Sequence, residues 1–409
     1  MAEVRVAVTG LGVVSPHGED PQAMFAALMR GESALKPIFP ELAKPAAAAT
    51  IDFDESRWFT KLQLAGVDRV SQMAVAAADL AVKDAGALDV DPERLGVFGG
   101  CGMGGATALE AAYRGGMATA GGRVPPLTIP AFMPNAPASQ VAMRQRAQGP
   151  VFTYSVACSS SAVAIAEAAK AVARGEVDVA IAGGAESLIV PGVVMAWQAM
   201  QTLAAFPAGD AQAAATAVKP FAADRSGFAL GEGAAFLVLE SEARARARQA
   251  RRYALLSGWG HSCDATHLTK PDAPGQARAL RAALAMAGLR PQDIGYCNAH
   301  GTATKIGDPI ERDALALVWG DALEGLKVSS TKALHGHLLG AAGALEAVIT
   351  ILALQQRQLP PNAHCAAVDP ACQLNLVGAQ GEAAPALAAA VGSSFAFGGS
   401  NAVLLFERA

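Results

Sequence analysis

Cys158 is the residue whose surroundings point most clearly to chemistry. It lies in the segment Tyr154-Ser-Val-Ala-Cys-Ser-Ser-Ser-Ala-Val163, where a β-rich run changes directly into a helix of small residues. A thiol in the first turn of a helix faces unpaired N–H groups and the positive end of the helix dipole, which both favour the thiolate. A buried cysteine acting only as a small apolar residue is the common alternative. The Ser-Ser-Ser-Ala run has no side chain large enough to enclose the sulfur, so we interpret Cys158 as a nucleophile.

Three polar segments in the second half of the chain hold the other candidate groups. They span residues 298–311, 328–346 and 393–401. The first is a predicted strand end followed by a turn, the second is the head of a very apolar helix, and the third is a glycine turn between two apolar strands. Their imidazole, hydroxyl, ammonium and carboxylate groups belong to His300, Thr302, Thr304, Lys332, His335, His337 and Glu346.

Metal and nucleotide sites are the alternatives for these patterns. The pair His335-x-His337 has strand-like spacing, which would place both imidazoles on one face, but no third or fourth ligand stands at a usual distance. The set His261, Cys263 and His267 fails the same test. The glycines of Gly10-Leu-Gly12 and of segment 99–105 do not form a GxGxxG followed by a helix and a later acidic residue. We therefore expect neither a metal nor a nucleotide.

Composition limits the class of protein. With 409 residues, 52% of them hydrophobic, the chain can bury a large core and form two domain-sized units. A net charge of −4 argues against nucleic acid or an anionic membrane as partner. The six cysteines contain no CxxC pair, which indicates free thiols in a reducing compartment.

The N-terminal residues and one apolar run bear on localisation. The N-terminus alternates like a first strand and carries no signal peptide. The apolar run Leu338 to Leu354 is shorter than the roughly 20 residues of a membrane span, and Gly340, Gly343 and Glu346 interrupt it. These features predict a core helix in a soluble cytoplasmic protein.

Strand-like runs alternate with helical stretches along the whole chain, which is typical of an α/β protein with buried sheets. The predicted strands are 4–8, 95–99, 177–182, 235–239, 253–257, 296–299, 391–394 and 402–406. The predicted helices are 71–84, 159–174, 275–287, 311–319 and 343–355, and segment 203–225 is predicted to be a surface loop. The basic stretch 241–252, interpreted as a solvated helix face, divides the chain into halves at 1–249 and 250–409.

Several motifs, taken together, resemble those of the β-ketoacyl-[acyl carrier protein] synthases. The strongest are Ala157-Cys158-Ser-Ser, Asn298-Ala-His300-Gly-Thr-Ala-Thr and Gly336-His337-Leu-Leu-Gly-Ala-Ala-Gly. Supporting segments lie along the whole chain, at 8–16, 182–186, 220–228, 231–234 and 397–401. The order and separation of the motifs make the resemblance highly specific.

The resemblance implies a thiolase-like fold of five layers, α-β-α-β-α, built from two related halves. The first half would carry the nucleophilic cysteine and the second both histidines. It also implies a decarboxylative Claisen condensation, in which Cys158 takes an acyl group and malonyl-acyl carrier protein supplies the carbanion. The expected partners are acyl carrier protein and a second subunit, in a homodimer or in a heterodimer with a related ketosynthase-like chain. No cofactor is expected, because the substrates are carried on phosphopantetheine.

The resemblance also implies a role for each candidate residue. His300 and His337 would donate N–H groups to the thioester oxygen of the malonyl group, and Lys332 and Glu346 would support them as a buried pair. The backbone N–H groups of Cys158 and Phe397 would form the oxyanion hole, and Phe397 would gate the acyl site. Thr302 and Thr304 would bind the pantetheine arm. Asp308 and Glu311 would support the loop that carries His300.

Departures from the family pattern favour a specialised pathway over housekeeping fatty-acid elongation. Ala303 replaces a common serine, and Ala396 replaces a frequent glycine beside Phe397, where a Cβ restricts the backbone. The family often carries a basic patch for the carrier near residues 58–72, and here only Lys61 and Arg69 remain. With the small candidate tunnel residues 106–108, these features favour a type II polyketide or polyene synthase.

Three related proteins are the alternatives. A thiolase would need a second cysteine in the glycine turn 397–401, which has none. A starter-unit synthase carries Cys-His-Asn, whereas His337 fills the third place here. A non-catalytic chain-length partner normally lacks the cysteine that this chain has at position 158. An elongating, catalytic synthase is therefore the expected function.

Overall fold

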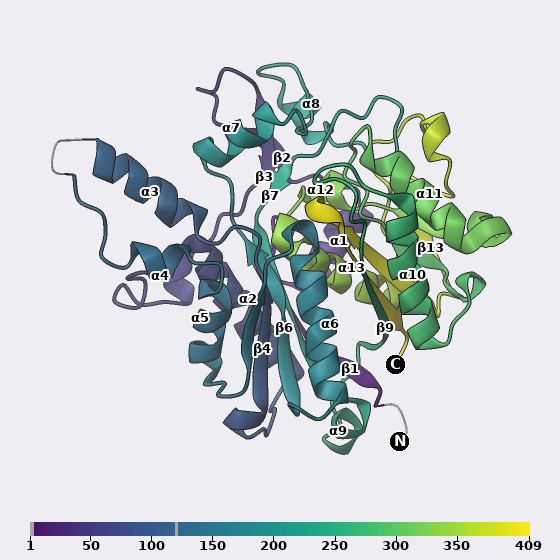
Figure 1. The fold of residues 1–409 in the computed structure, drawn as a ribbon, viewed down its shortest axis with the longest axis horizontal. Coiled ribbons are helices and arrows are strands. Elements are labelled where there is room, and N and C mark those ends of the chain that lie inside the picture. Colours follow the sequence, from purple (N-terminus) through teal and green to yellow (C-terminus); the bar gives the residue numbers. More distant parts are fainter. Residues whose placement is uncertain (1–3, 119–121) are drawn as a thin grey trace.

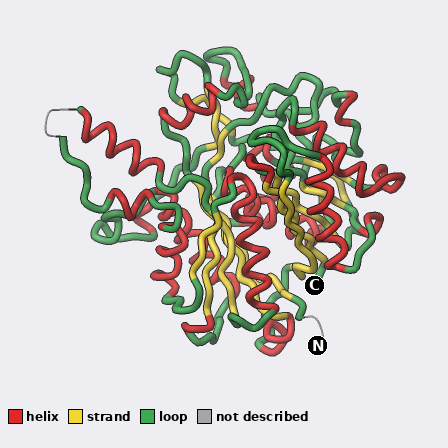
Figure 2. The backbone as a smooth tube through the Cα atoms, viewed as in Figure 1, coloured by secondary structure: helices red, strands yellow, loops and turns green. Residues whose placement is uncertain are grey.

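The computed structural model describes residues 4–118 and 122–409, which form two groups of strands with helices between and outside them (Figures 1 and 2). The strands are β1 Val6–Val14, β2 Leu35–Ile38, β3 Ala46–Ala49, β4 Leu95–Gly100, β5 Val151–Tyr154, β6 Val179–Glu186, β7 Leu230–Gly231, β8 Gly233–Ser241, β9 Ala254–Cys263, β10 Tyr296–Asn298, β11 Lys327–Ser329, β12 Gln358–Leu359, β13 Glu382–Ala383, β14 Ala389–Phe395 and β15 Ser400–Glu407. The helices are α1 Pro21–Met29, α2 Arg69–Ala85, α3 Ala106–Met117, α4 Thr128–Phe132, α5 Ala136–Gln145, α6 Ser160–Ala173, α7 Pro191–Ala199, α8 Ala211–Ala215, α9 Glu242–Ala247, α10 Ala273–Ala287, α11 Gly307–Trp319, α12 Lys332–His335 and α13 Ala342–Gln356.

The main sheet consists of two halves with the same pattern of strand directions. Its order is β11-β10-β14-β15-β9-β1-β8-β6-β4-β5. In the first half β5, β4 and β6 are parallel, and β8 and β1 then alternate in direction. In the second half β11, β10 and β14 are parallel, and β15 and β9 alternate in the same way. The halves meet where β1 pairs with β9, and this shared topology makes them related units although no sequence repeat is visible.

Helices complete the five predicted layers. Helices α2 and α5 pack on the outer face of the first half, and α10, followed by α11, covers the second half. Helices α6 and α13 pack against each other between the two groups of strands, as Figure 1 shows. The α/β thiolase-like class is therefore confirmed. The only helix in the described ranges with the length and hydropathy of a membrane span is Leu339–Gln356, and 89% of that segment is buried inside the protein.

Several strands are longer than predicted, and in β1 and β9 the added residues include glycines that allow a helix to approach. Strand β1 continues through Gly10 and Gly12 to Val14. A Cβ at Gly10 would lie 2.2 Å from the carbonyl oxygen of Ala81 in α2, and one at Gly12 only 2.0 Å from that of Ala77. Strand β9 extends to Cys263 in the same way, packed against α10. The glycine pair at the start of the chain therefore serves helix–sheet packing.

The basic stretch 241–252 contains α9, and its arginines are engaged in ion pairs. Arg248 binds Glu240 at 2.5 Å, and Arg246 binds Glu242 at 2.6 Å. This local pairing accounts for the run of charge without a nucleic-acid partner. The predicted surface loop 203–225 contains the five-residue helix α8, and the sequence analysis did not predict α3, α5 or α7.

Candidate active site

Cys158 lies in a strained turn between β5 and α6. It is the middle residue of the 3-10 turn Ala157–Ser159, and α6 begins at the next residue, Ser160. Ala157 has a left-handed backbone with φ 49°, which is unfavourable for a residue with a Cβ. Ala303 and Leu339, near the two histidines, also have positive φ values, of 59° and 46°. Such strain gathers where the surrounding fold holds functional groups in place.

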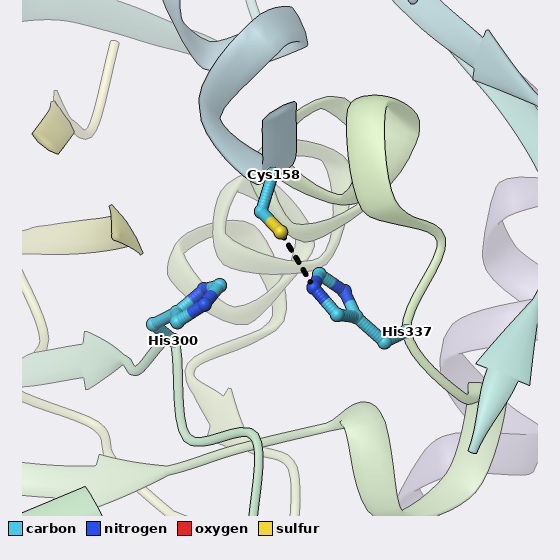
Figure 3. A group of neighbouring side chains, drawn as sticks. All are labelled: Cys158, His300 and His337. Carbon is cyan, nitrogen blue, oxygen red and sulfur yellow. Dashed lines mark hydrogen bonds between the residues drawn. The ribbon is translucent and has the colours of Figure 1, made fainter. Parts of the chain in front are cut away.

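The two halves of the chain bring one thiol and two imidazoles together (Figure 3). His300 follows β10, and His337 follows the short helix α12. The Sγ atom of Cys158 lies 3.1 Å from Nε2 of His337, and the two imidazole rings are 5.4 Å apart between centroids. One nitrogen of each ring and the sulfur lie within 4.8 Å of one another. Both rings therefore flank the sulfur.

The backbone selects the tautomer of His337. The N–H group of Leu339 donates to Nδ1 of His337 at 3.3 Å. Because a backbone N–H can only donate, Nδ1 is the unprotonated nitrogen, and a neutral ring then carries its proton on Nε2. That N–H points at Sγ of Cys158. His337 is thus set to donate a hydrogen bond to the sulfur, or to an oxygen that takes its place.

Burial keeps both histidines neutral. The pKa of His300 is lowered well below its ordinary value by burial and then by the positive charge of Lys332. The pKa of His337 is lowered well below its ordinary value by burial, by Lys332 and by two neighbouring histidines, His300 and His335. Neutral imidazoles can donate one N–H each without the cost of a buried charge.

The expectation that the helix start favours a thiolate at Cys158 is wrong for the resting site. Burial raises the pKa of Cys158 the most, Lys332 lowers it, and the carboxylates Glu186 and Glu346 raise it, which together bring it to about 12. The side chain is only 7% exposed, so the loss of water disfavours the thiolate. The resting residue is a thiol, and the N–H of His337 stabilises the charge that develops on sulfur during attack.

Lys332 and Glu346 form a buried ion pair beneath the histidines. The Nζ atom of Lys332 lies 2.5 Å from Oε1 of Glu346, and both side chains are almost fully buried. Burial raises the pKa of Glu346 to about 7, and Lys332 acts in the opposite direction. The pair therefore holds a positive charge near the imidazoles, which lowers their pKa values.

Two buried carboxylates hold the loop that carries His300. Glu311 accepts hydrogen bonds from the backbone N–H groups of His300 and Gly301, at 2.8 and 2.7 Å. Asp308 accepts one from the backbone N–H of Phe221 at 2.7 Å. Arg225, which the motif 220–228 contains, donates to the carbonyl oxygens of Thr304 and Lys305. These bonds position the His300 loop.

A cavity of about 430 Å³ leads from the surface to Cys158. Thr302 and Thr304 line it, with their hydroxyl oxygens 3.2 Å apart. Phe397 lines it from the turn Phe397–Gly399, in which Gly398 and Gly399 have φ values of 84° and 73°. The backbone N–H of Gly398 donates to the carbonyl oxygen of Leu268 at 2.7 Å. All predicted substrate-side groups thus share one cavity.

Other cavity residues were absent from the sequence prediction. They include the aromatic residues Trp197 and Phe228, and the exposed apolar residue Leu268. Phe228 lies inside a quoted motif and could have been included, whereas a single tryptophan in an apolar helix carries no signal of its own.

His335 does not form a pair with His337. Its Nε2 atom bonds the hydroxyl of Thr331 at 2.9 Å and its Nδ1 lies 2.8 Å from the carbonyl oxygen of Gly336. The set with the spacing of a metal site is instead Cys158, His300 and His337, the same three side chains that acyl transfer would use. Absence of a metal remains a prediction, which a chelator tests below.

Comparison with known proteins decides the family. The family model "Beta-ketoacyl synthase, N-terminal domain" matches residues 3–245, and "Beta-ketoacyl synthase, C-terminal domain" matches residues 253–366. The chain belongs to the β-ketoacyl synthase family. It is accordingly a condensing enzyme of the acyltransferase type.

Relatives and solved structures match this synthase over its whole length. A "3-oxoacyl-[acyl-carrier-protein] synthase 2" of Staphylococcus aureus is 36% identical, covering 99% of this chain and 98% of the relative. "Nodulation protein E" of Rhizobium meliloti is 39% identical, covering 99% of both. The structure of "The ishigamide ketosynthase/chain length factor" has a TM-score of 0.91 at 32% identity, covering 100% of both chains. A chain of the structure "AntDE:AntF (apo): type II PKS acyl-carrier protein in complex with its ketosynthase bound to the hexaketide" has a TM-score of 0.90 at 26% identity, covering 100% of both chains.

Of the two basic residues near positions 58–72 of the synthase, fewer are available to a partner protein than the sequence indicates. Arg69 binds Glu232 through two nitrogens, with contacts of 2.7 and 3.0 Å, and also donates to the carbonyl oxygen of Ile51. Only Lys61 of the two is exposed and without such a partner among the described residues. Of the candidate tunnel residues, Ala106 packs in the apolar cluster that contains Cys158, whereas Thr107 is exposed.

Proposed function

We propose that the synthase catalyses decarboxylative condensation of an acyl group on Cys158 with malonyl-acyl carrier protein. In the first half-reaction, Sγ of Cys158 attacks the carbonyl carbon of an acyl phosphopantetheine thioester. A carbon–sulfur bond to Cys158 forms, the bond to phosphopantetheine breaks, and the released carrier thiol takes up the proton that the cysteine thiol loses. The observation that carries this proposal is the 3.1 Å contact between Sγ and the protonated nitrogen of His337.

The second half-reaction uses both imidazoles as donors. Once Sγ is acylated, the Nε2–H of His337 and an N–H of His300 are available to the thioester oxygen of the malonyl group. Loss of carbon dioxide leaves an enolate whose negative charge these two donors stabilise. The carbanion then attacks the Cys158 thioester, forming the new carbon–carbon bond, and the cysteine leaves as its thiolate and regains a proton.

The tetrahedral intermediate on Cys158 needs donors of its own. We assign this role to the backbone N–H groups of Cys158 and Phe397, since Phe397 lines the cavity beside the sulfur. Thr302 and Thr304 line the same cavity and offer hydroxyls to the pantetheine arm. The chemistry needs no bound cofactor, because both acyl groups arrive on carrier phosphopantetheine.

The proposed partners are acyl carrier protein and a second subunit. Strand β5 is at the end of the sheet order and pairs only with β4 among the described residues. Its side chains Val151 and Phe152 are exposed, which leaves an apolar strand edge open for another chain. We propose a homodimer, or a heterodimer with a related ketosynthase-like subunit, in the cytoplasm. Native mass spectrometry of the chain alone separates the two, since only the homodimer forms without a partner.

The pathway we propose is type II polyketide or polyene assembly. The whole-length match to a ketosynthase/chain length factor structure and the thin basic patch support this assignment. The assembled cysteine and both histidines do not favour a non-catalytic partner.

The test is incubation with a panel of acyl carrier proteins and malonyl carrier protein, with product lengths determined by mass. We expect Cys158→Ala to abolish both the acyl-enzyme and the β-ketoacyl product. Acyl transfer to the protein that persists in this variant would contradict the assignment of the nucleophile.

A further inference from the structure

Trp197 connects the turn that carries Phe397 to the catalytic histidine through a row of aromatic rings. Its indole stacks on the Phe397 ring, with centroids 6.0 Å apart and an interplanar angle of 29°. It meets Phe228 edge to face at 5.4 Å and 77°. Phe228 in turn meets His337 edge to face at 5.3 Å. The roles assigned above to Cys158, His300, His337 and Phe397 leave Trp197 without a function.

Trp197 packs against the apolar part of the surroundings of Cys158. Thr302 and Thr304 give the cavity polar groups that suit pantetheine. The apolar cluster that contains Cys158 includes Leu188, Val190, Val194, Phe228, Leu339 and Ala396, with Trp197 packed against it. A hydrocarbon chain bound to Sγ is stabilised in this cluster and not among the threonines.

Trp197 lies on a helix held at both ends, whereas Phe397 lies on a turn that contains two glycines. Helix α7 is held near its start by the hydrogen bond from Gly192 N–H to Glu110, and near its end by Gln198 bonds to the carbonyl oxygens of Lys44 and Pro45. Val194, one turn before Trp197, is fully buried on the same face. Phe397, by contrast, begins a turn that continues with two glycines of positive φ.

We propose that Trp197 is a specificity-determining residue, whose indole face binds the acyl chain when Phe397 moves away and so favours conjugated over saturated chains. This inference rests on the proposed function, because it requires an acyl group on Cys158. A chain conjugated with its thioester is flat and presents a π surface, so it replaces the stacking that Trp197 loses from Phe397. A saturated chain fills the space but offers no such surface. Stacking of this kind is worth about 2- to 12-fold in rate or affinity beyond burial.

The experiment compares two acyl groups of equal length on the same carrier protein, hexanoyl and 2,4-hexadienoyl. Acylation of Cys158 is followed in single-turnover reactions by intact-protein mass, and the quantity of interest is the ratio of the two rates. Conjugation itself lowers the reactivity of the thioester carbonyl, so the dienoyl-to-hexanoyl ratio of the native chain is compared with that of each variant. We expect Trp197→Leu and Trp197→Met to lower this ratio by about 2- to 12-fold relative to the native chain, and Trp197→Phe to lower it less.

Met195→Ala is the matched control, because Met195 is exposed on the same helix and does not line the cavity. It should keep the native ratio. A dienoyl-to-hexanoyl ratio in folded Trp197→Leu or Trp197→Met that equals or exceeds the ratio of the native chain overturns the inference. Failure of both acyl groups to modify the native chain would instead count against the proposed function, so the two failures are distinguishable.

Discussion

Replacement of Lys332 by methionine, alone and together with a change at Glu346, separates the effect of the buried ion pair on stability from its effect on the pKa values of the two catalytic histidines. Lys332 is fully buried and lies 2.5 Å from Glu346. Removing one partner of such a pair leaves an unpaired buried charge, which costs about 3–5 kcal/mol of unfolding free energy. Replacing both partners, as in Lys332→Met with Glu346→Leu, removes the charge and should recover most of that loss.

The destabilisation of Lys332→Met should depend on pH in a defined direction. Burial already raises the pKa of Glu346 from 4.5 to about 7, and loss of the cation raises it further. A carboxyl with a raised folded-state pKa is tolerated below about pH 4.5, where it is protonated in both states. As pH rises above about 4.5, the unfolded state ionises while the folded state stays protonated, until pH passes the raised pKa of Glu346 and the loss of stability levels off. The stability of the single variant should therefore fall as pH rises, whereas the double variant should show no such additional slope.

Activity should not return with stability in the double variant. Lys332 lowers the pKa of both His300 and His337. Without its charge the imidazoles protonate more easily, so the acid limb of the condensation rate should move to higher pH in both variants.

The measurements are denaturant unfolding from pH 5 to 8 and condensation rates over the same range. Lys170→Met is the matched control, since Lys170 also binds a glutamate at 2.5 Å but in a partly exposed pair, where the expected cost is below about 1 kcal/mol. If the double variant restores the native pH profile together with stability, Lys332 does not act on the histidines and our reasoning is refuted.

Three further predictions concern the same site. His337→Ala should block decarboxylation of malonyl carrier protein while Cys158 acylation stays measurable by mass, because its N–H donor serves the enolate; the reverse result would show that the roles are misassigned. Ala396→Gly should weaken the closed state of the Phe397 turn by about 0.5–1 kcal/mol through added backbone freedom and so alter rate or product length; unchanged values of both would rule out turn stiffness as the control. Dialysis against a chelator should leave condensation unchanged, since we assign no metal to the thiol and imidazoles; lost activity that returns with added metal would reverse that assignment.

The sequence alone was sufficient for the family, the fold class and the residues that meet at the site. The motifs around Cys158, His300 and His337 are short and local, so they can be recognised without knowledge of the tertiary structure. Helix α6 and helix α13 were also predicted within one residue at each end, because small or apolar runs bounded by turns define them. The end of β1 was predicted too early, at residue 8. A glycine that allows a helix to pack closely on a strand cannot be distinguished in sequence from one that forms a turn.

Tertiary structure decided the protonation and the pairing of these groups. Cys158 and His337 are brought to 3.1 Å by elements from different halves, and the tautomer of His337 depends on one backbone N–H. The thiol form of Cys158 follows from burial, which no local pattern reports. Arg69 was expected to be available to a carrier protein and instead binds Glu232. Residue type is local information, whereas desolvation and charge proximity are properties of the packed chain, so the sequence identified the reacting groups and only the fold determined their chemical state.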